Sequence, residues 1–413
     1  MAELRLTPAA SLAPGEANPD VVHMMRPGTL QLSALPPLTL YVHVPWCLRK
    51  CPYCDFNSHA WAPAQGDLPE AELLAALLAD VEAALPLVWG RPVHAVFIGG
   101  GTPSLLAPAT VEALLAAVRA RLNIVAGAEI TMEANPGTFE RDRFAAFAAA
   151  GVTRLSVGVQ SFDDAELSAI GRVHSAEQAH AAVAEVRQHF ETFNLDLMYA
   201  LPGQDLAAWR RNLQQALAHA PPHLSVYHLT LEPNTYFAKY PPALPDDDTA
   251  YEMLDVTVAE TARAGLSRYE VSAFARDGHR CRHNLNYWQF GDYLGIGPGA
   301  HSKLSFAHRV LRQVRLRDPQ HYIRQALQGR ALSSSTEVAR AELPFEFMLN
   351  ALRLCDGFEL PDFVARTGLP LSSVDAGLRE GVARGLLVQQ GQHYRPSAQG
   401  LDFLSDLQAL FLA

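Results

Sequence analysis

Six short apolar segments, separated by longer segments of helical periodicity, constrain the fold of this chain more than any other feature. The apolar segments are rich in β-branched residues, as strands are, and they occupy residues 38–44, 94–100, 129–135, 154–160, 193–199 and 224–230. The helical patterns occupy residues 70–85, 108–122, 139–151, 175–190, 205–219 and 246–265. Alternating strands and helices form a parallel sheet, which right-handed crossovers curve into a barrel. We therefore predict an α/β fold, a partial (β/α)6 TIM-like barrel over residues 38–270.

The two ends of the chain differ from this pattern. Residues 1–37 are rich in Pro, Ala and Gly and lack periodicity, so we predict a flexible amino-terminal segment. Residues 336–413 show three helical patterns and then a two-stranded pattern, which indicates a small winged-helix-like domain. Its acidic and basic residues are mixed, so a packing or lid role is favoured over DNA binding. Residues 271–335 are interpreted as a connecting segment.

Charge and hydropathy exclude several classes of protein. The chain has 413 residues and a formal net charge of −10, so it lacks the basic field of a protein that coats nucleic acid. No apolar run approaches the ~20 residues that span a bilayer. The amino-terminal sequence shows no secretory signal. We therefore expect a cytoplasmic protein, whose thiols stay reduced.

Three of the five cysteines fall within one short stretch, "YVHVPWCLRKCPYCDFNSH". Cys47, Cys51 and Cys54 directly follow the first predicted strand. Iron–sulfur clusters are held by cysteine thiolates, usually four for a four-iron cluster. Cys281 and Cys355 are far away in the sequence. Three local thiolates would therefore leave one iron without a protein ligand and open to another molecule.

A zinc site completed by His43 or His59 is the alternative for these thiols. Zinc sites more often show paired two-residue spacings, so the spacing of three and then two residues favours an iron–sulfur cluster. Arg49 and Lys50 lie between the thiols, and we expect their charge to favour the ionised thiolates.

Polar and glycine-rich features follow the other predicted strands. "GGGTPS" (99–104) follows the second strand, "EANPG" (133–137) closes the third, Gln160 ends the fourth and Asp196 lies in the fifth. In a parallel barrel the chemistry lies at the carboxyl ends of the strands, so we expect these features to share one face. Each has a structural alternative: a turn before a helix, a helix cap, or a hydrogen-bond acceptor.

Together these motifs resemble the radical S-adenosylmethionine enzymes. The closer match is to the oxygen-independent coproporphyrinogen III oxidase family, over about residues 38 to 413. The motifs that carry it are "YVHVPWC", "CPYCDF", "GGGTPS", "EANPG", "SVGVQSF", "GRVHS", "NLDLMYALPGQ" and "HNLNYW". The resemblance implies a 4Fe–4S cluster whose open iron binds S-adenosylmethionine. In that superfamily, reduction of the cluster cleaves the sulfonium to a 5′-deoxyadenosyl radical.

The resemblance also implies roles for individual residues. Cys47, Cys51 and Cys54 would hold the cluster. The positions implied in S-adenosylmethionine binding are Tyr41, Tyr53, Gly100, Gly101, Thr102, Glu133, Gln160, Arg172 and Asp196. Some of these contact a second S-adenosylmethionine in the oxidase, so their separate duties stay open. The glycines would let backbone approach the ligand closely.

Two departures separate the chain from the oxidase itself. Phe56 stands where the oxidase has a fourth cysteine, and the amino-terminal segment is short. Both departures, and "HNLNYW" (283–288), match the haem chaperone branch of the family. That branch implies a protein that binds haem and delivers it to acceptor proteins, with membrane-associated respiratory proteins as candidates. The alternatives are coproporphyrinogen III decarboxylation, which the departures argue against, and radical chemistry on another substrate. No catalytic residue is assigned.

The expected haem site is less defined. His283 can ligate haem iron, and Tyr287 and Trp288 can flank the macrocycle. Cys281 is a rival ligand, and a packed, hydrogen-bonded histidine is the structural alternative. A basic strip that could bind haem propionates or form a solvated strand face comprises Arg309, Arg312, Arg315 and Arg317.

Overall fold

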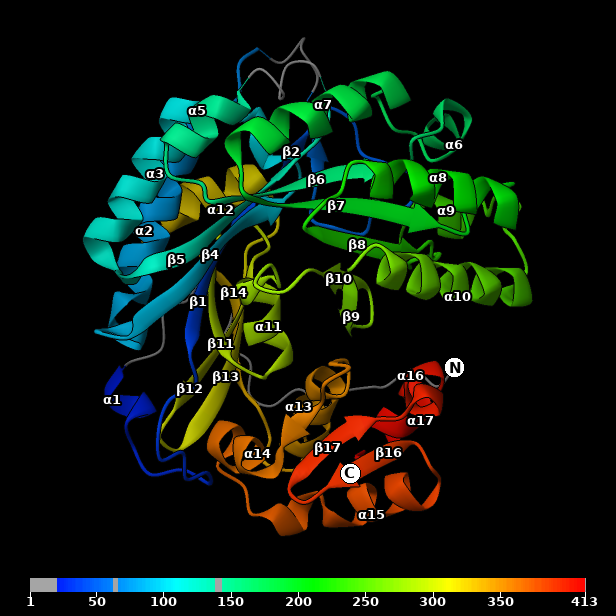
Figure 1. Ribbon diagram of the computed structural model, residues 1–413. Helices are drawn as coiled ribbons and strands as arrows, with labels where there is room; N and C mark the ends of the chain where they lie inside the picture. Colours follow the sequence, from blue (N-terminus) through cyan, green and yellow to red (C-terminus); the bar gives the residue numbers. More distant parts are fainter. Residues whose placement is uncertain (1–20, 62–65, 138–142, 413) are drawn as a thin grey trace.

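The computed structural model describes residues 21–61, 66–137 and 143–412. Within those residues the largest sheet has twelve strands in the order β14-β13-β12-β11-β1-β4-β5-β6-β7-β8-β10-β9 (Figure 1). Six of these strands match the six predicted ones: β1 (Leu38–Val44), β4 (Pro92–Gly100), β5 (Asn123–Ala134), β6 (Arg154–Gln160), β7 (Thr192–Tyr199) and β8 (His223–His228). Within this run of six, each strand pairs in parallel with the next. The edge strands β14 and β9 do not pair, so the barrel is open. The prediction of a partial α/β barrel is confirmed.

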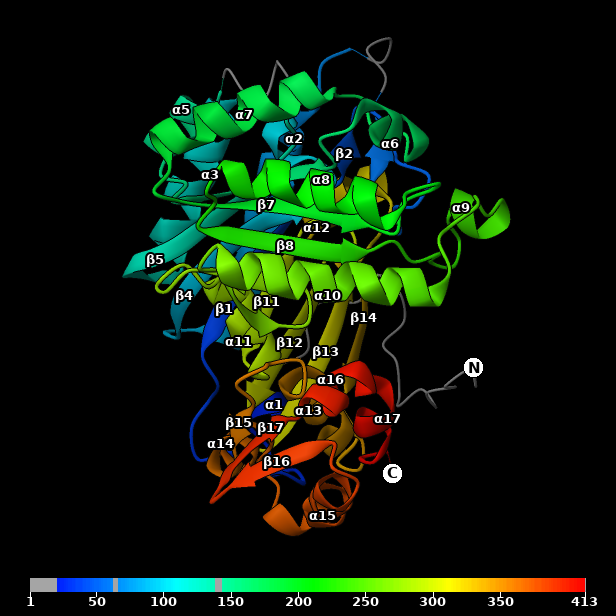
Figure 2. The ribbon, with the colours of Figure 1, turned by 45° about the vertical axis from the view of Figure 1, so that its right-hand side comes forward.

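Helices cover the outer face of the curved sheet (Figures 1 and 2). They are α2 (Glu70–Val88), α3 (Pro108–Arg121), α5 (Phe144–Ala149), α6 (Asp164–Ala169), α7 (Ala176–His189), α8 (Leu206–Ala218) and α10 (Asp247–Arg263). Side chains fix where several begin: Ser175 and Gln178 form a reciprocal capping box on α7, and Asp205 caps α8. Part of the predicted helix at 139–151 lies outside the described residues.

Residues 271–335, expected as a connecting segment, mostly extend the same sheet. They form β10 (Ala273–Ala275), α11 (Arg282–Trp288), β11 (Asp292–Ile296), β12 (His301–Phe306), β13 (Arg309–Arg315), α12 (Pro319–Ala326) and β14 (Leu332–Glu337), and β9 (Ser267–Glu270) precedes them. Strand β11 is a seventh parallel strand beside β1, and β12 to β14 continue antiparallel. All of β11 is buried, so its five residues pack as core strand although they carry little periodicity.

The described part of the amino-terminal segment is packed, which differs from the expected flexibility. It contains α1 (Val21–Met24), and Met24, Leu30 and Leu32 are buried. The backbone amides of Leu30 and Leu32 donate to the carbonyls of His308 and Ala307, at 3.2 and 2.9 Å. Burial of these spaced apolar side chains therefore orders a segment whose composition predicted no ordered structure. Residues 1–20 lie outside the described part.

The carboxy-terminal region packs below the barrel in Figure 1. It comprises α13 (Leu343–Ala351), β15 (Phe358–Glu359), α14 (Leu360–Thr367), α15 (Asp375–Ala383), β16 (Leu387–Gln390), β17 (His393–Pro396), α16 (Ala398–Asp402) and α17 (Leu404–Ala409). Its apolar core includes Phe347, whose ring meets Phe290 of the barrel at 5.7 Å between centroids. We therefore propose this winged-helix-like unit as a domain fixed to the barrel by a shared core.

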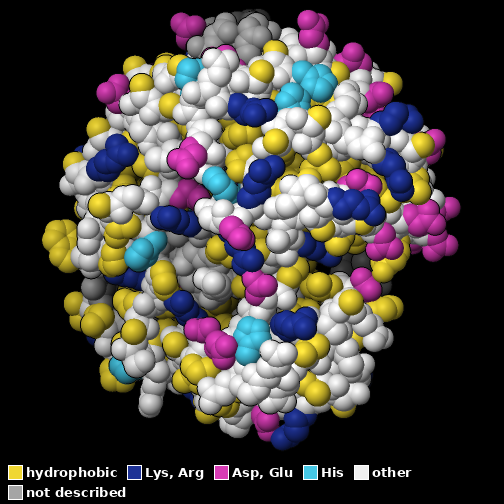
Figure 3. Space-filling model, viewed as in Figure 1, with side chains coloured by type: hydrophobic (Ala, Val, Ile, Leu, Met, Phe, Trp, Pro, Cys, Tyr) yellow, Lys and Arg dark blue, Asp and Glu magenta, His cyan; other side chains and the backbone are white. Residues whose placement is uncertain are grey.

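The surface shows no single-sign field on the face that Figure 3 presents, where Lys and Arg side chains are interspersed with Asp and Glu. In the described residues, none of the helices has the length and apolar character needed to cross a bilayer.

Candidate functional site

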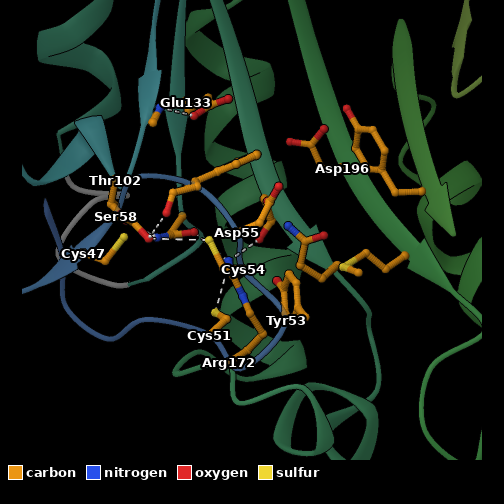
Figure 4. A pocket seen from close by; sticks show the side chains of 18 of the residues that line it. Cys47, Cys51, Tyr53, Cys54, Asp55, Ser58, Thr102, Glu133, Arg172 and Asp196 are labelled. Carbon is orange, nitrogen blue, oxygen red and sulfur yellow. Dashed lines mark hydrogen bonds between the residues drawn. The ribbon is translucent and has the colours of Figure 1, made fainter. Parts of the chain in front are cut away.

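A cavity of about 340 Å³ lies at the carboxyl ends of the parallel strands (Figure 4). The strand-end features expected to share one face do so. The predicted site residues that line it are Cys47, Cys51, Tyr53, Cys54, Gly100, Gly101, Thr102, Glu133, Gln160, Arg172 and Asp196. They come from five strand-to-helix connections that are up to 149 residues apart in the sequence, from Cys47 to Asp196.

The cysteine loop leaves β1 and is closed by a short parallel pair, β2 (Trp46–Cys47) and β3 (His59–Ala60). The loop also bonds to the glycine-rich turn, because the amides of Gly101 and Thr102 donate to the carbonyls of Val44 and Trp46, each at 2.7 Å. The thiols and the glycine turn are therefore held as one unit.

The glycines of this turn are required by close approach. At Gly101 a Cβ atom would lie 2.5 Å from the Trp46 carbonyl oxygen. Gly100 has a φ of +113°, and its Cβ atom would lie 2.6 Å from the His43 ring. The backbone therefore forms a shallow floor beside the thiols that no larger residue could provide.

Burial, rather than neighbouring charge, is the largest influence on the pKa values of the Cys47 and Cys54 thiols. It raises the pKa of Cys47 to about 11 and also raises that of Cys54. Lys50 lowers the pKa of Cys54 only as a smaller effect. The charge of Lys50 thus acts in the expected direction on Cys54, but burial outweighs it. Thiolates here would have to form together with a bound metal, whose charge offsets their burial.

The zinc alternative finds little support in the geometry. Among the described residues, no three Cys, His, Asp or Glu side chains are arranged to hold a single metal ion. His43 uses both ring nitrogens in hydrogen bonds, to the Tyr41 hydroxyl and the Asn57 carbonyl, each at 3.0 Å. A zinc ion needs ligands that converge on one position, whereas in a cluster each thiolate binds a different iron.

Arg172 connects the thiol loop to the strand ends. Its guanidinium donates to Asn135 Oδ1 and the Gly158 carbonyl, both at 2.6 Å, and lies 3.8 Å from Cys51 Sγ. Its Nε is buried without a hydrogen-bond partner in the described chain. A buried donor without a hydrogen bond is costly in free energy. The site therefore suits a ligand that offers an acceptor, such as a carboxylate.

Two carboxyl groups face the cavity from β5 and β7. Glu133 accepts a hydrogen bond from the Gly100 amide at 2.9 Å. Burial, together with the charge of Asp196, raises the pKa of Glu133 to about 8. Burial also raises the pKa of Asp196, which accepts from Ser156 and Asn194. The Asp196 carboxylate thus serves both as a structural acceptor and as cavity wall.

Three other predicted residues complete the wall. Gln160 has a φ of 66° and follows an irregularity in the β6–β7 pairing, so its backbone is strained where it meets the cavity. Tyr53 packs against a small apolar cluster that includes Met198. Thr102 is buried and accepts a hydrogen bond from Asn135 Nδ2 at 3.0 Å.

A second cavity of about 440 Å³ adjoins the first and shares Asp55, Phe56, Gly100 and Glu133 with it. The remaining wall is formed by Tyr41, His43, Asn57, His283, Tyr287, Tyr293, Gly299, His301 and Arg317. Tyr41, implied in S-adenosylmethionine binding, lines this second cavity and not the first. Phe56, which replaces the oxidase's fourth cysteine, stands on the boundary between them.

His283 lies in the second cavity with Tyr41, and it does not line the first. Its ring packs 4.9 Å from the Phe97 ring and 6.3 Å from the Tyr41 ring, between centroids. Burial lowers its pKa to about 4, and its Nδ1 is buried with no hydrogen-bond partner in the described chain. Within the described residues, Nδ1 therefore lacks the hydrogen bond that the structural alternative requires. A neutral, unpaired imidazole suits metal ligation.

Other expectations around the second cavity are not met. Cys281 is 2 % exposed, lies 3.5 Å from Glu129 Oε1 and lines neither cavity. Burial raises the pKa of its thiol to about 12, so it is a poor candidate ligand. Trp288 also lies away from the cavity wall, with the Arg353 guanidinium 4.3 Å from its ring.

Three arginines of the expected basic strip are committed elsewhere. Arg309 lies 3.5 Å from Glu337, Arg312 bonds Glu346 at 2.7 Å, and Arg315 bonds Asp80 at 3.2 Å. These three side chains of β13 are therefore paired with carboxylates of other elements. Arg317, just beyond the strand, reaches the second cavity.

Sequence reasoning did not identify Asn57, Tyr293 and His301 as part of a site, and it named Arg317 only within the basic strip that could bind haem propionates. Asn57 lies in the cysteine loop, whereas Tyr293, His301 and Arg317 lie 236 or more residues later in the sequence. Only pairing of β11 with β1 brings them together.

Comparison with known proteins supports this architecture. Residues 41–216 match the family model of the radical SAM superfamily, and residues 338–403 match that of the HemN C-terminal domain. The chain is 46% identical over 381 residues to the haem chaperone HemW of Escherichia coli, covering 92% of this chain and 99% of that protein. It is 42% identical to the haem chaperone HemW of Haemophilus influenzae, covering 92% of this chain and 98% of that protein.

A mouse protein is also similar, the mitochondrial radical S-adenosyl methionine domain-containing protein 1. It is 38% identical, with 89% of this chain and 86% of that protein covered. Among solved structures, coproporphyrinogen III oxidase (HemN) of Escherichia coli superposes with a TM-score of 0.78 at 24% identity. The match covers 91% of this chain and 90% of that one, and it shows the fold.

Proposed function

The chain belongs to the radical S-adenosylmethionine superfamily and, within it, to the HemW family, and from this premise we propose that it is a haem chaperone. It would bind a 4Fe–4S cluster, S-adenosylmethionine and haem, and deliver haem to acceptor proteins in the cytoplasm or at a membrane. The observation that carries the proposal is a second cavity, directly beside the thiol-lined one, into which an unpaired histidine projects.

The first cavity suits the cluster and S-adenosylmethionine. Cys47, Cys51 and Cys54 would hold the cluster, and the glycine floor and Arg172 would take the methionine part of the ligand. When bound, a reduced cluster would supply an electron to the sulfonium at its open iron. The chain's own residues position that ligand and exclude water around it.

The second cavity suits haem. His283 offers a neutral imidazole to the iron, and Tyr41, Tyr287 and Phe56 offer aromatic surface to a flat macrocycle. Its volume of about 440 Å³ is within the range of small-molecule sites, and haem would partly protrude. A haem that protrudes can be handed to another protein.

Anaerobic incubation of the reconstituted protein tests this function. With S-adenosylmethionine, a reductant and coproporphyrinogen III, we expect no protoporphyrinogen IX by chromatography, because Phe56 replaces the oxidase's fourth cysteine. Beside it, a haem titration should saturate at roughly one haem per chain with a shifted Soret band. Turnover near the ~1–10³ s⁻¹ typical of enzymes would contradict the chaperone function. Absence of saturable haem binding would also contradict it.

Binding of S-adenosylmethionine should tighten as pH rises from 6 to 8. Glu133 has a pKa of about 8 in the ligand-free protein, so it is mostly protonated at pH 7. A cationic ligand favours the ionised carboxylate of Glu133, so binding must release a proton. The affinity for S-adenosylmethionine should then rise by up to about tenfold per pH unit. Calorimetry in two buffers of different ionisation enthalpy measures that proton. Glu133→Gln should abolish the release, whereas Glu232→Gln, in the same wall, should keep it. Equal release by both variants would refute the assignment.

A further inference from the structure

We propose that Arg317 and His301 form a carboxylate subsite at the rim of the second cavity, which fixes the orientation of the bound macrocycle. The inference deepens the proposed function and rests on it, since the carboxylates in question are the propionates of haem. Both residues line the second cavity and neither lines the first.

The position of Arg317 is fixed by the cysteine loop. Asn57 Nδ2 donates to the carbonyl oxygens of Pro298 and Arg317, at 2.9 and 2.8 Å. Gly299 is packed so closely on this amide that a Cβ atom would lie 2.6 Å from its nitrogen. The backbone that carries Arg317 is therefore tied to the loop that carries the thiols, and the subsite is coupled to the cluster site.

The guanidinium of Arg317 differs from its neighbours along the chain. Arg309, Arg312 and Arg315 each lie within 4 Å of a carboxylate. In the part of the chain that the structure describes, the Arg317 side chain makes no hydrogen bond or ion pair, and the residue is exposed at the cavity rim. It carries five donors that match a carboxylate in fork geometry.

Local electrostatics favour an anion at this point. After burial, the charge of Arg317 contributes to lowering the pKa of His301, together with Arg312. The carboxylate of Asp318 is already used, since it caps α12 by accepting from the His321 amide at 2.7 Å. A bound carboxylate would supply the counter-charge that the Arg317 guanidinium lacks.

The distribution of charge along the second cavity then sets the orientation of the bound macrocycle. Asp55 lies on the boundary with the first cavity, where its carboxylate would repel anionic groups of a ligand. Aromatic rings line the interior, and Arg317 stands outside the shared boundary. The propionates would therefore point away from the cluster, with the macrocycle between.

A titration with haem and with its dimethyl ester tests the subsite, using the full-length protein. The wild type should bind haem about tenfold more tightly than the ester, because only haem offers charged carboxylates. Arg317→Gln should weaken haem binding by about tenfold and leave ester binding unchanged. Arg324→Gln, an exposed arginine on α12 that lines neither cavity, should behave as wild type.

The outcomes separate the subsite from the proposed function. Equal affinity of the wild type for haem and ester would overturn the subsite while leaving haem binding intact. So would an Arg317→Gln variant that keeps the wild-type preference. A wild type that binds neither ligand saturably would overturn the proposed function itself.

Discussion

Replacing Cys47, Cys51 and Cys54 together with alanine should remove the cluster completely. After anaerobic reconstitution, the wild type is expected to hold four irons per chain, as a four-iron cluster requires. The triple variant should hold none, and it should lose both the brown absorbance and the paramagnetic signal of the reduced state. The reason is that these thiols line one cavity beside a fixed glycine turn.

The two remaining cysteines provide the matched control. Cys281 is buried against Glu129, and the Cys355 amide is bonded to the Tyr269 carbonyl outside the cavity. Alanine at either position should therefore leave the iron content at four. A triple variant that still holds four irons would show that the cluster is bound elsewhere.

Replacing Asp80 with alanine should strongly lower the free energy of unfolding. Asp80 is 1% exposed and accepts from Arg315 Nε at 3.2 Å and from the Tyr322 hydroxyl at 2.8 Å. It ties α2 to β13 and α12, and the Tyr322 hydroxyl also accepts from the Gly297 amide at 3.0 Å. Losing it leaves the buried Arg315 charge unpaired, which costs about 3–5 kcal/mol. In a chain of 413 residues, the midpoint of thermal unfolding should fall by roughly 3–6 °C.

Glu82 offers a control on the same helix. It pairs with Arg121 at 2.6 Å, but its side chain is 55% exposed. Such pairs contribute about 0–1 kcal/mol, so Glu82→Ala should change the midpoint little. If Asp80→Ala proved no more destabilising than Glu82→Ala, the Asp80 contacts would not anchor the extended sheet as inferred.

The barrel was predictable because its strands carry a strong local signal. Runs such as 38–44 and 154–160 are β-branched, bounded by turn residues and separated by amphipathic helices, so element type follows from pattern. Strand β11 was missed because "DYLGI" is five residues long, contains glycine and precedes "GPG". Strand β14, "LSSSTE", is largely polar, because it lies at the sheet edge.

The first cavity was predictable to a greater extent than the second. Its residues end successive parallel strands, and that topology alone places them together. The second cavity depends on a return of the chain, in which Asn57 bonds carbonyls 241 and 260 residues later. Burial of Cys281 is likewise a tertiary effect, since nothing in the local sequence separates it from an exposed ligand. The residue pattern therefore could not decide between Cys281 and His283.

Haem spectra of the wild type, His283→Ala and Cys281→Ala test the central claim most directly. Because His283 faces the second cavity and Cys281 does not, the histidine variant should show an altered Soret band and weaker binding. The cysteine variant should match the wild type, which should saturate at roughly one haem per chain. A His283→Ala variant with wild-type spectrum and affinity would contradict the placement of haem in the second cavity.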